Sequence, residues 1–350
     1  MLFGKKPHLV GLDIGSRIIK VGELAESKKG YRLKSFGTID ISAGLIEEGV
    51  IKDPETVADS IRELFKTHNI KEQNVAISIG GYSVIVKKIS VQTMTEQELQ
   101  DTIQFEAEQY IPFDISDVNL DFQILGEADN PDQMNVLLVA AKTDMIEDYI
   151  NLVQLSGLNP CIIDVDAFAL QNIYELNYDV EDENVALIDI GAGKTSLNIL
   201  QGGASLFMRD VALGCSQINE KISSLVDCSF EEAEQLKLGE GTGKISLEDK
   251  TEIISSVTAD WCDEIRRALD YFYSTDSETQ IKRIILSGGG AHIETFRNLL
   301  ATETSTEVEM INPMANIDLD NKNTDSAFLD QIAPQAAICL GLALRRIDDK

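Results

Sequence analysis

The chain has 350 residues, of which 43% are hydrophobic and 25% are charged, a balance typical of a globular protein with room for about two domains. No apolar run reaches the roughly 18 residues that cross a bilayer, and the first residues contain no apolar stretch of signal-peptide length. With 59 acidic residues against 30 basic ones, the net charge is −29, which argues against a nucleic-acid binder or an electrostatic membrane anchor.

The N-terminal part predicts three strands, a helix and a further strand. Residues 8–14 form a near-continuous apolar strand, and a Gly-Ser turn leads into a second strand that ends near Leu24. The alternating stretch GYRLKSFGTIDIS predicts the third strand. Asp53-Pro54 is a good start for a helix over residues 54–68, and NVAISIGG returns as a strand.

An inserted segment, residues 83–160, follows this unit. Its helix TEQELQDTIQFEAEQYI opens with a capping box of Thr95 and Glu98 and stops at Pro112. The apolar stripe of this helix, formed by Leu99, Ile103, Ala107 and Tyr110, favours packing in a core over ligand binding. The strands SVIVKKISV, NLDFQILGE and NVLLVAAK, a helix near 144–156 and the stretch PCIIDVD are expected to complete a small α+β subdomain, with GEADNPDQ as a hairpin tip.

The second half of the chain repeats the order of the first. Strands are predicted at 184–190, 194–201 and near 204–211, followed by helical segments and the strand RIILSGGG at 283–290. HLVGLDIGSRIIKVGEL aligns with NVALIDIGAGKTSLNIL so that Asp13 falls on Asp189 and Gly15 on Gly191. This repeat indicates a duplication of mixed α/β units, in which two similar domains each present an Asp-Ile-Gly turn to a shared cleft.

The two turns carry groups that suit a phosphate and a metal ion. Glycine lets backbone N–H groups come close to a phosphate, and a nearby Ser or Thr hydroxyl adds a donor. The carboxylates of Asp13 and Asp189 would repel phosphates directly, but they are good ligands for magnesium. We therefore predict that both turns grip a phosphate tail, with both aspartates near the metal. The candidate residues are Asp13, Gly15, Ser16, Asp189, Gly191, Gly193 and Thr195.

Other glycine-rich stretches are less specific. Gly288, Gly289 and Gly290 lead from a strand into a helix, where the backbone can pass a ribose or adenine, although a plain tight turn explains the same triplet. IGAGKTS and LGEGTGKI end like phosphate-binding P-loops, but Ile188 and Leu238 stand where that motif requires glycine.

Cysteine and histidine give no support for a disulfide framework or a metal site. The 5 cysteines are odd in number and lack CxxC spacing, which is typical of reduced thiols in a cytosolic protein. The 3 histidines, His8, His68 and His292, are scattered along the chain.

The motifs GLDIGSRIIKV, LIDIGAGKTSL and ILSGGGAHI, in this order over nearly the whole chain, resemble the two phosphate motifs and the adenosine motif of the actin/Hsp70/sugar-kinase superfamily. The resemblance implies duplicated actin-like (RNase H-like) α/β domains around a central cleft that holds ATP and Mg²⁺. It also implies a phosphate contact for Lys20. Through FEEAEQLKLG it implies nucleoside contacts for Glu234 and Lys237, with surface Glu/Lys pairing as an equal alternative.

Within the superfamily the chain looks most like the PilM family of type IV pilus assembly proteins, relatives of the division protein FtsA. The similarity is carried by LFGKK, GLDIGS, AEQYIPFD, LVAAK, SGLNPCIIDVDAFAL and AAICLGLALRR. It implies a cytoplasmic scaffold of the inner-membrane assembly platform that binds the N-terminal cytoplasmic segment of PilN in a groove of subdomains 1A and 1C. Other pilus components, including the motor ATPases, and further copies of the chain in an oligomer or ring are additional candidate partners.

The same resemblance divides the chain into four subdomains. Residues 1–82, 161–183 and 331–350 are expected to form subdomain 1A, and residues 83–160 form the FtsA/PilM-type subdomain 1C. Residues 184–215 and 279–330 form subdomain 2A, and residues 216–278 form subdomain 2B.

Catalysis is expected to be weak at most. Asp164 and Asp166, at the end of CIIDVD, are candidates to order an attacking water, but a helix-cap or loop role is an equal alternative. The alternative functions are an FtsA-like division filament and a related secretion-system platform protein. FtsA adds a C-terminal amphipathic membrane helix, whereas this chain stops at LGLALRRIDDK, whose apolar part suits closure of the first domain and whose two arginines make a poor anchor.

Overall fold

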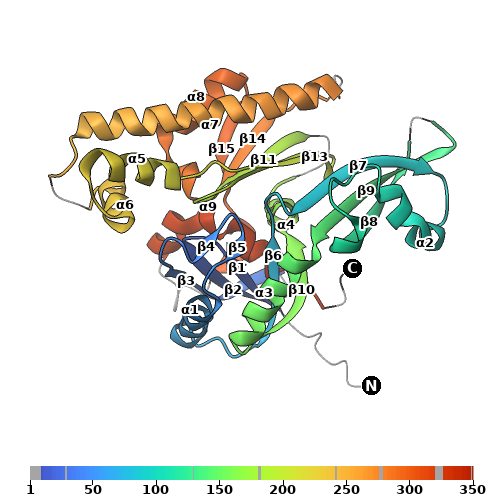
Figure 1. Ribbon diagram of the computed structural model, residues 1–350, viewed down its shortest axis with the longest axis horizontal. Helices are drawn as coiled ribbons and strands as arrows, with labels where there is room; N and C mark the ends of the chain where they lie inside the picture. The colour runs from blue at the N-terminus through green and yellow to red at the C-terminus, as the bar shows by residue number, and fades with distance from the viewer. Residues whose placement is uncertain are drawn as a thin grey trace.

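The computed structural model describes residues 9–27, 30–128, 130–179, 183–240, 243–275, 279–319, 326–347 and 349. Within these ranges the strands form a six-stranded, a five-stranded and a three-stranded sheet, and a two-stranded hairpin of β4 (Ile46–Glu47) and β5 (Val50–Ile51). Figure 1 shows the five-stranded sheet under the long helix α7, the six-stranded sheet below it, and the three-stranded sheet to the right.

The six-stranded sheet belongs to what we call the first domain, and its strand order is β10-β6-β1-β2-β3-β16. The strands are β1 (Val10–Ile14), β2 (Ile18–Ser27), β3 (Gly30–Asp40), β6 (Asn74–Ile79), β10 (Asn159–Val165) and β16 (Ile317–Leu319). β1, β2 and β3 form an antiparallel meander, while β6 runs parallel to β1 and β10 runs parallel to β6.

The five-stranded sheet belongs to the second domain and follows the same plan, in the order β13-β12-β11-β14-β15. The strands are β11 (Asn184–Ile190), β12 (Thr195–Gln201), β13 (Ala204–Val211), β14 (Arg283–Ser287) and β15 (Glu307–Met310). β11, β12 and β13 again form an antiparallel meander, and β14 and β15 again add in parallel. The predicted duplication of α/β units is therefore confirmed.

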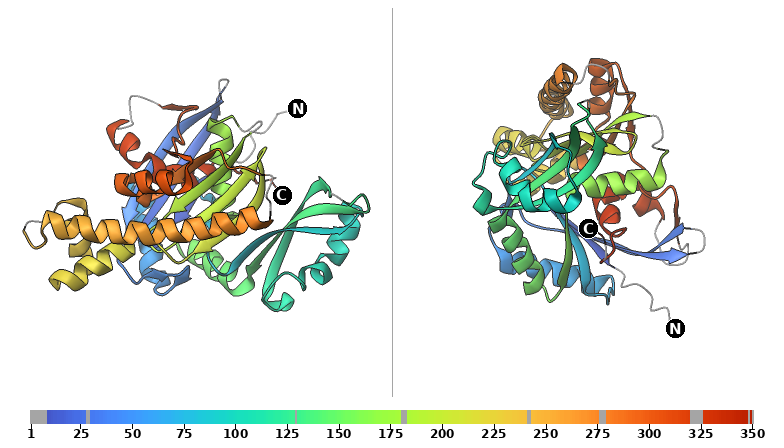
Figure 2. Two further views of the ribbon diagram at one scale, coloured as in Figure 1. Left: turned by 90° about the horizontal axis from the view of Figure 1, so that it is seen from above. Right: turned by 90° about the vertical axis from the view of Figure 1, so that its right-hand side faces the viewer.

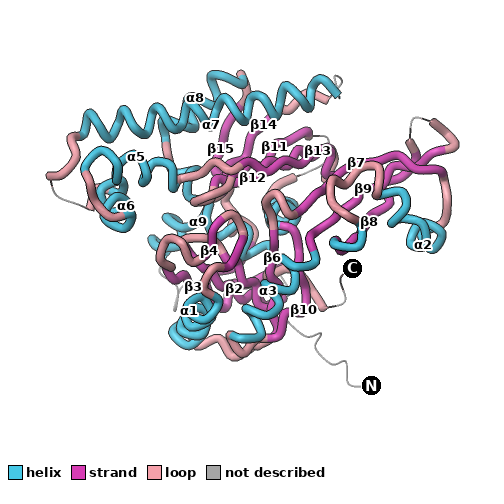
Figure 3. Tube along the Cα trace, in the orientation of Figure 1, coloured by secondary structure: helices cyan, strands magenta, loops and turns pink. Residues whose placement is uncertain are grey.

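Helices cover the outer face of each sheet and fill the space between the two sheets. α1 (Pro54–Thr67) and α3 (Thr143–Leu155) pack on the outer face of the first sheet. α5 (Ser216–Val226), α6 (Phe230–Leu238), α7 (Leu247–Thr275) and α8 (Glu294–Thr304) share a core with the second sheet. α4 (Asp166–Asn177) and α9 (Ser326–Leu342) contribute to a core that takes residues from both sheets, and Figure 3 shows α9 between them.

The beginning of α1 shows how the sequence specifies a local element. Asp53 caps the helix by accepting a hydrogen bond of 3.1 Å from the backbone N–H of Thr56, and Pro54 stands in the first turn, where its missing N–H costs nothing. Val57, Ile61 and Leu64 then fall on one buried side. The predicted helix is confirmed to within one residue.

The three-stranded sheet and α2 (Glu96–Ala107) form what we call the small subdomain. Its strands β7 (Val84–Gln92), β8 (Val118–Glu127) and β9 (Gln133–Lys142) pair in the order β7-β9-β8, with a short 3₁₀ helix, η1 (Ile115–Asp117), before β8. The capping box of Thr95 and Glu98 is present, and Leu99, Ile103 and Ala107 are buried in this subdomain's own core. Figure 2 shows that the small subdomain projects away from the two domains.

Two expectations about the domain limits are wrong. The helix near 144–156 does not belong to the small subdomain, because Tyr149 and Leu152 of α3 pack in the core that α1 shares with the first sheet. The stretch PCIIDVD does not complete the small subdomain either: β10 pairs with β6, in agreement with the assignment of residues 161–183 to subdomain 1A. Residues 279–330 do not all belong to the second domain, because Ile317–Leu319 pairs with β3 of the first sheet. Both errors have the same cause, since these short apolar segments fit either core and only packing chooses between them.

Candidate functional site

The two Asp-Ile-Gly turns meet between the domains. The first turn, Gly15–Arg17, joins β1 to β2, and the second, Gly191–Lys194, joins β11 to β12. They lie close together, because a Cβ atom built on Gly193 would stand 3.8 Å from the Ser16 Oγ. The predicted facing arrangement of the two turns is therefore present.

Asp13 and Lys20 form the charged part of the first hairpin. The two residues are cross-strand neighbours on β1 and β2, and the Lys20 Nζ lies 2.8 Å from the Asp13 Oδ2. Burial alone would lower the pKa of Lys20, but the carboxylates of Asp13 and Asp189 outweigh it and raise that pKa above its ordinary value. Lys20 therefore stays positively charged beside the two aspartates, and the predicted contact with a phosphate requires this charge.

Asp189 occupies the equivalent position in the second hairpin. Ser287 at the end of β14 donates a hydrogen bond of 2.6 Å to its Oδ1. Burial raises the pKa of Asp189 to about 6, although the Ser287 hydroxyl and Lys20 oppose the change, and Asp13 adds to it. Two carboxylates that repel one another in a buried place suit a divalent cation. The described residues contain no cluster of three or more His, Cys, Asp or Glu side chains around this pair, so waters and phosphates would supply the remaining ligands.

Lys194, at the tip of the second turn, reaches the first domain. Its ammonium group pairs with the Asp166 carboxylate at the start of α4 and lies 3.7 Å from the Asp210 Oδ2 on β13. Burial would raise the pKa of Asp166, but Lys194 overcomes this effect and lowers the pKa. Sequence reasoning missed Lys194 as a site residue, because it considered this lysine only as part of a failed P-loop match.

The backbone of both turns can serve as a phosphate cradle. A Cβ atom on Gly15 would lie 2.6 Å from the Ile18 carbonyl oxygen, so glycine is required there. Among the described residues, no carbonyl or side chain accepts from the backbone N–H groups of Ser16, Ala192 or Gly193. Free N–H groups at a tight turn suit an anion.

The two hydroxyl candidates differ. Thr195 is only 2% exposed, and its hydroxyl donates a hydrogen bond of 2.9 Å to the Leu213 carbonyl oxygen, which ties β12 to the end of β13. Ser16 lies at the junction of the two turns. The geometry therefore favours Ser16 over Thr195 as a donor to a ligand.

Glu234 and Lys237 of α6 lie on the second domain's side of the junction. The Lys237 Nζ is 2.8 Å from the Glu234 Oε2, and Asn219 of α5 donates to the same carboxylate oxygen. The Glu/Lys pairing that the sequence left as the alternative is thus present, and the nucleoside contact stays a prediction. Burial would raise the pKa of Glu234, but Lys237, Asn219 and Arg17 together lower it.

Asn219 is a candidate that the sequence did not reveal. It is 1% exposed, and its Oδ1 has no hydrogen-bond partner among the described residues. A buried amide oxygen without a donor is costly, so it is well suited to receive a hydroxyl or amino group of a nucleoside. No motif spacing marks this residue, because it is brought to Glu234 only by the packing of α5 against α6.

The first turn also contacts α6. The Arg17 guanidinium stands over the Phe230 ring at 4.9 Å from its centroid, and its Nη1 lies 3.8 Å from the Glu231 Oε1. These contacts join the first turn to α6 of the second domain.

The glycine triplet is explained mainly by close packing. Gly288 has φ +80°, and a Cβ atom there would overlap the Ile190 carbonyl oxygen, while one on Gly290 would overlap the Ile190 side chain. Only Gly289 has room beside it, with the Gln335 side chain 4.0 Å from its Cβ position. Gly289, at the start of the 3₁₀ helix η2 (Gly289–His292), is therefore the member of the triplet best placed to face a ligand.

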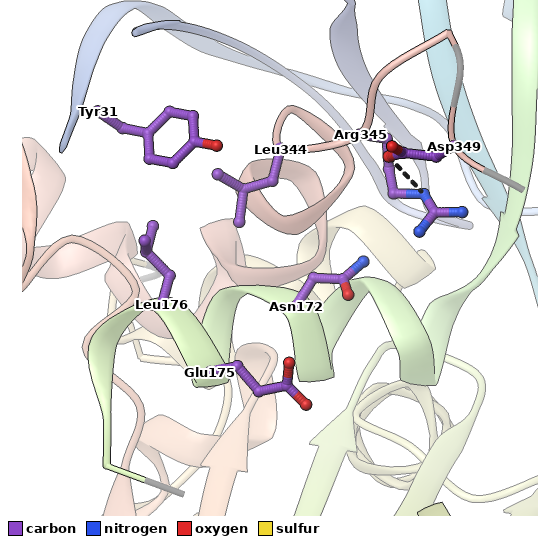
Figure 4. A pocket seen from close by; sticks show the side chains of 7 residues that line it. All are labelled: Tyr31, Asn172, Glu175, Leu176, Leu344, Arg345 and Asp349. Carbon is purple, nitrogen blue, oxygen red and sulfur yellow. Dashed lines mark ion pairs between the residues drawn. The ribbon is translucent and has the colours of Figure 1, made fainter. Parts of the chain in front are cut away.

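The two aspartates considered for water activation, Asp164 and Asp166, have different ion-pair partners in the structure. Among the described residues, Asp166 forms an ion pair with Lys194 of the second turn, whereas Asp164 forms one with Arg345 at 3.2 Å and none with either turn. Burial raises the pKa of Asp164, although Arg345 opposes this rise. Arg345 and Asp349 line a separate cavity of about 320 Å³ between α4, β3 and the C-terminal segment (Figure 4). Asp166 is therefore the better placed of the two candidates, and a role in ordering water stays a prediction.

Comparison with known proteins identifies several relatives. A sequence profile of the family described as type IV pilus assembly protein PilM matches residues 11–347. The solved structure described as a PilM-PilN type IV pilus biogenesis complex is similar with 27% identity and a TM-score of 0.87, covering 99% of this chain and 100% of that chain.

More distant relatives agree with the fold. The cell division protein FtsA of Bacillus subtilis (strain 168) is 24% identical over 260 residues, which are 65% of this chain and 57% of FtsA, so the match spans little more than half of that relative. MreB5 of Spiroplasma citri bound to AMPPNP is 14% identical with a TM-score of 0.50, over 89% of this chain and 93% of that chain. The actin-like fold is thereby confirmed, and in MreB5 this fold binds an ATP analogue.

Proposed function

The chain belongs to the PilM family of type IV pilus assembly proteins, and we propose that it acts there as a scaffold that binds ATP with magnesium and holds the cytoplasmic N-terminal segment of PilN. The observation that carries the nucleotide part is the close approach of two matching Asp-Ile-Gly turns from opposite domains. The partner part is supported by the similarity to the PilM of a PilM-PilN complex over the whole length of that chain.

The proposed nucleotide site uses residues of both domains. The backbone N–H groups of the two turns, the Ser16 hydroxyl and Lys20 would hold the phosphates, with Asp13 and Asp189 toward the metal. Magnesium, when bound, neutralises phosphate charge that this acidic chain would otherwise repel. The nucleoside end would lie toward Gly289 and the cluster of Asn219, Glu234 and Lys237.

Turnover of ATP is proposed to be slow. A general base needs a carboxylate that is free to accept a proton from water. Asp166 is the candidate, but its ion pair with Lys194 lowers its pKa and occupies one of its oxygens. The carboxylate is therefore a weak base in this arrangement, and binding rather than rapid hydrolysis would be the main activity.

Attachment to the inner membrane is proposed to depend on PilN. No described helix is long and apolar enough to cross a membrane. Arg345 and Arg346, the two arginines near the C-terminus, are engaged by Asp164 and Glu26. These arginines are therefore poor candidates for holding anionic lipid.

Isothermal titration calorimetry of the full chain tests the nucleotide part. ATP should bind in the presence of Mg²⁺ and bind much more weakly when EDTA removes the metal. Asp270→Asn, at an exposed position of α7, is the matched control for the loss of one carboxylate charge in Asp13→Asn or Asp189→Asn, and it should bind as the unchanged chain does. Undetectable MgATP binding by the unchanged chain would overturn this part.

The partner part is tested separately with a synthetic peptide of the PilN N-terminal segment. The peptide should bind to the chain in solution, and a scrambled peptide of the same composition should not. Sedimentation with ATP and bare liposomes is the second arm: polymers that form on the lipid without PilN would contradict the scaffold and favour an FtsA-like filament.

A further inference from the structure

A short segment, Gly80–Tyr82, connects the first domain to the small subdomain. It follows β6, which ends at Ile79, and it leads within two residues into β7. Two bonds from the second domain hold this connecting segment: the Gly81 N–H donates to the Asp210 carboxylate, and the Tyr82 hydroxyl accepts a hydrogen bond of 3.2 Å from the Ala212 N–H. The small subdomain is thus anchored at its root by the domain that carries the second phosphate turn.

Asp210 is shared between this connecting segment and the second turn. Its Oδ1 accepts a hydrogen bond of 2.6 Å from Ser196, and its Oδ2, which holds the Gly81 N–H, lies 3.7 Å from the Lys194 ammonium. Lys194 also lies against the backbone of the connecting segment, because a Cβ atom on Gly80 would overlap its ammonium group. Lys194 is therefore a residue of the second turn that contacts both the Asp166 carboxylate and the connecting segment at the root of the small subdomain.

This sharing has an electrostatic consequence. Lys194 is held by the two carboxylates of Asp166 and Asp210, which raise its pKa above its ordinary value against the effect of burial. A phosphate between the turns adds a third anion within reach of the same ammonium group, and a charge-assisted bond to it competes with the two existing pairs. When Lys194 turns toward the phosphate, the Asp210 carboxylate loses part of the positive charge beside it. The hydrogen bond that Asp210 accepts from the Gly81 N–H then changes in strength.

We propose that Lys194 and Asp210 transmit phosphate occupancy of the cleft to the Gly80–Tyr82 segment, and through it to the small subdomain. The proposal rests on the nucleotide site proposed above. The nucleotide would then regulate partner binding. The partner groove is expected between the first domain and the small subdomain, and the connecting segment joins these two parts. Nucleotide state would then set how the small subdomain is held, without any need for fast hydrolysis.

Hydrogen exchange of the full chain, followed by mass spectrometry with and without MgATP, tests the proposal. In the unchanged chain, MgATP should alter the exchange rate of the peptide that covers residues 79–86 by at least about threefold. Asp210→Asn keeps the shape of the side chain and does not remove a phosphate contact. This variant should keep its Kd for MgATP within about threefold and lose the exchange response.

Three further variants keep the test decisive. Lys194→Met should also lose the response, whereas Lys221→Met, which removes an exposed lysine of α5 in the same domain, should retain it. Tyr82→Phe changes a side chain that is 62% exposed and therefore folds normally, and it should weaken the response by removing the second bond.

The outcomes separate this inference from the proposed function. Failure of the unchanged chain to bind MgATP overturns the nucleotide site itself. Binding without any change in exchange at residues 79–86, or a full response in Asp210→Asn or Tyr82→Phe, overturns the inference and leaves the nucleotide site standing.

Discussion

The two Asp-Ile-Gly hairpins have the same strand register, but their charged side chains pair differently. In the first hairpin, Lys20 pairs with Asp13 across adjacent strands of its own domain. In the second hairpin the residue opposite Asp189 is Ser196, and the lysine stands at the tip of the turn. That lysine, Lys194, pairs with Asp166 of the other domain.

The comparison separates what the duplication shares from what it does not. Both turns carry glycine and, among the described residues, backbone N–H groups without an acceptor, and the proposed phosphate site requires both features. The lysines are not under that requirement. One supports its own hairpin, and the other ties the two halves together, so the two turns are expected to respond differently when they are changed.

The largest expected effect is the loss of metal-dependent binding in both hairpins. Asp13→Asn and Asp189→Asn should each weaken MgATP binding by about 100-fold, the equivalent of about 3 kcal/mol, because each removes a charge directed at the cation. Calorimetry with and without EDTA measures this. If only one variant loses affinity, the two turns do not act as a pair.

Lys194→Met is expected to destabilise the chain by about 2 kcal/mol, because it leaves the partly buried Asp166 without its partner. Adding Asp166→Asn should recover most of that loss, since the stranded charge is then gone. Urea unfolding measures the free energy of unfolding of both single variants and the double variant. Purely additive losses would show that the ion pair across the cleft does not exist.

The affinity for MgATP should fall about tenfold between pH 7 and pH 5, because burial raises the pKa of Asp189 to about 6 and a proton then competes with the metal. The effect on stability has the opposite sign. The folded-state pKa lies above the unfolded value, so the ionised carboxylate weakens the fold above pH 6, and this penalty fades as the pH falls. In Asp189→Asn the decrease in affinity around pH 6 should disappear.

The smallest expected effect concerns Arg17, which belongs to the first turn and has no counterpart in the pairing of the second. Arg17→Ala should speed the release of nucleotide about threefold, because it removes a cation–π contact worth about 0.5–1 kcal/mol. Stopped-flow displacement of a fluorescent ATP analogue measures the rate. Phe230→Leu should have the same effect, and the double variant should be no faster than either one.

Local sequence patterns were sufficient for much of the fold. The duplicated strand–Asp–Ile–Gly–strand phrase, the Asp53-Pro54 start of α1 and the capping box of α2 were all readable from the sequence. Each depends on periodicity or capping within about ten residues, and neighbouring residues supply nearly all of the interactions that decide it.

Tertiary structure decided which distant residues meet. Asp164 and Asp166 look equivalent in the sequence, yet one pairs with Arg345 near the C-terminus and the other with Lys194 of the second turn. In the same way, α3 joined the core of the first domain and Ile317–Leu319 joined its sheet. A charge or a short apolar segment can satisfy several partners equally well, and only the packing of both domains around α4 and α9 brings one of those partners within reach.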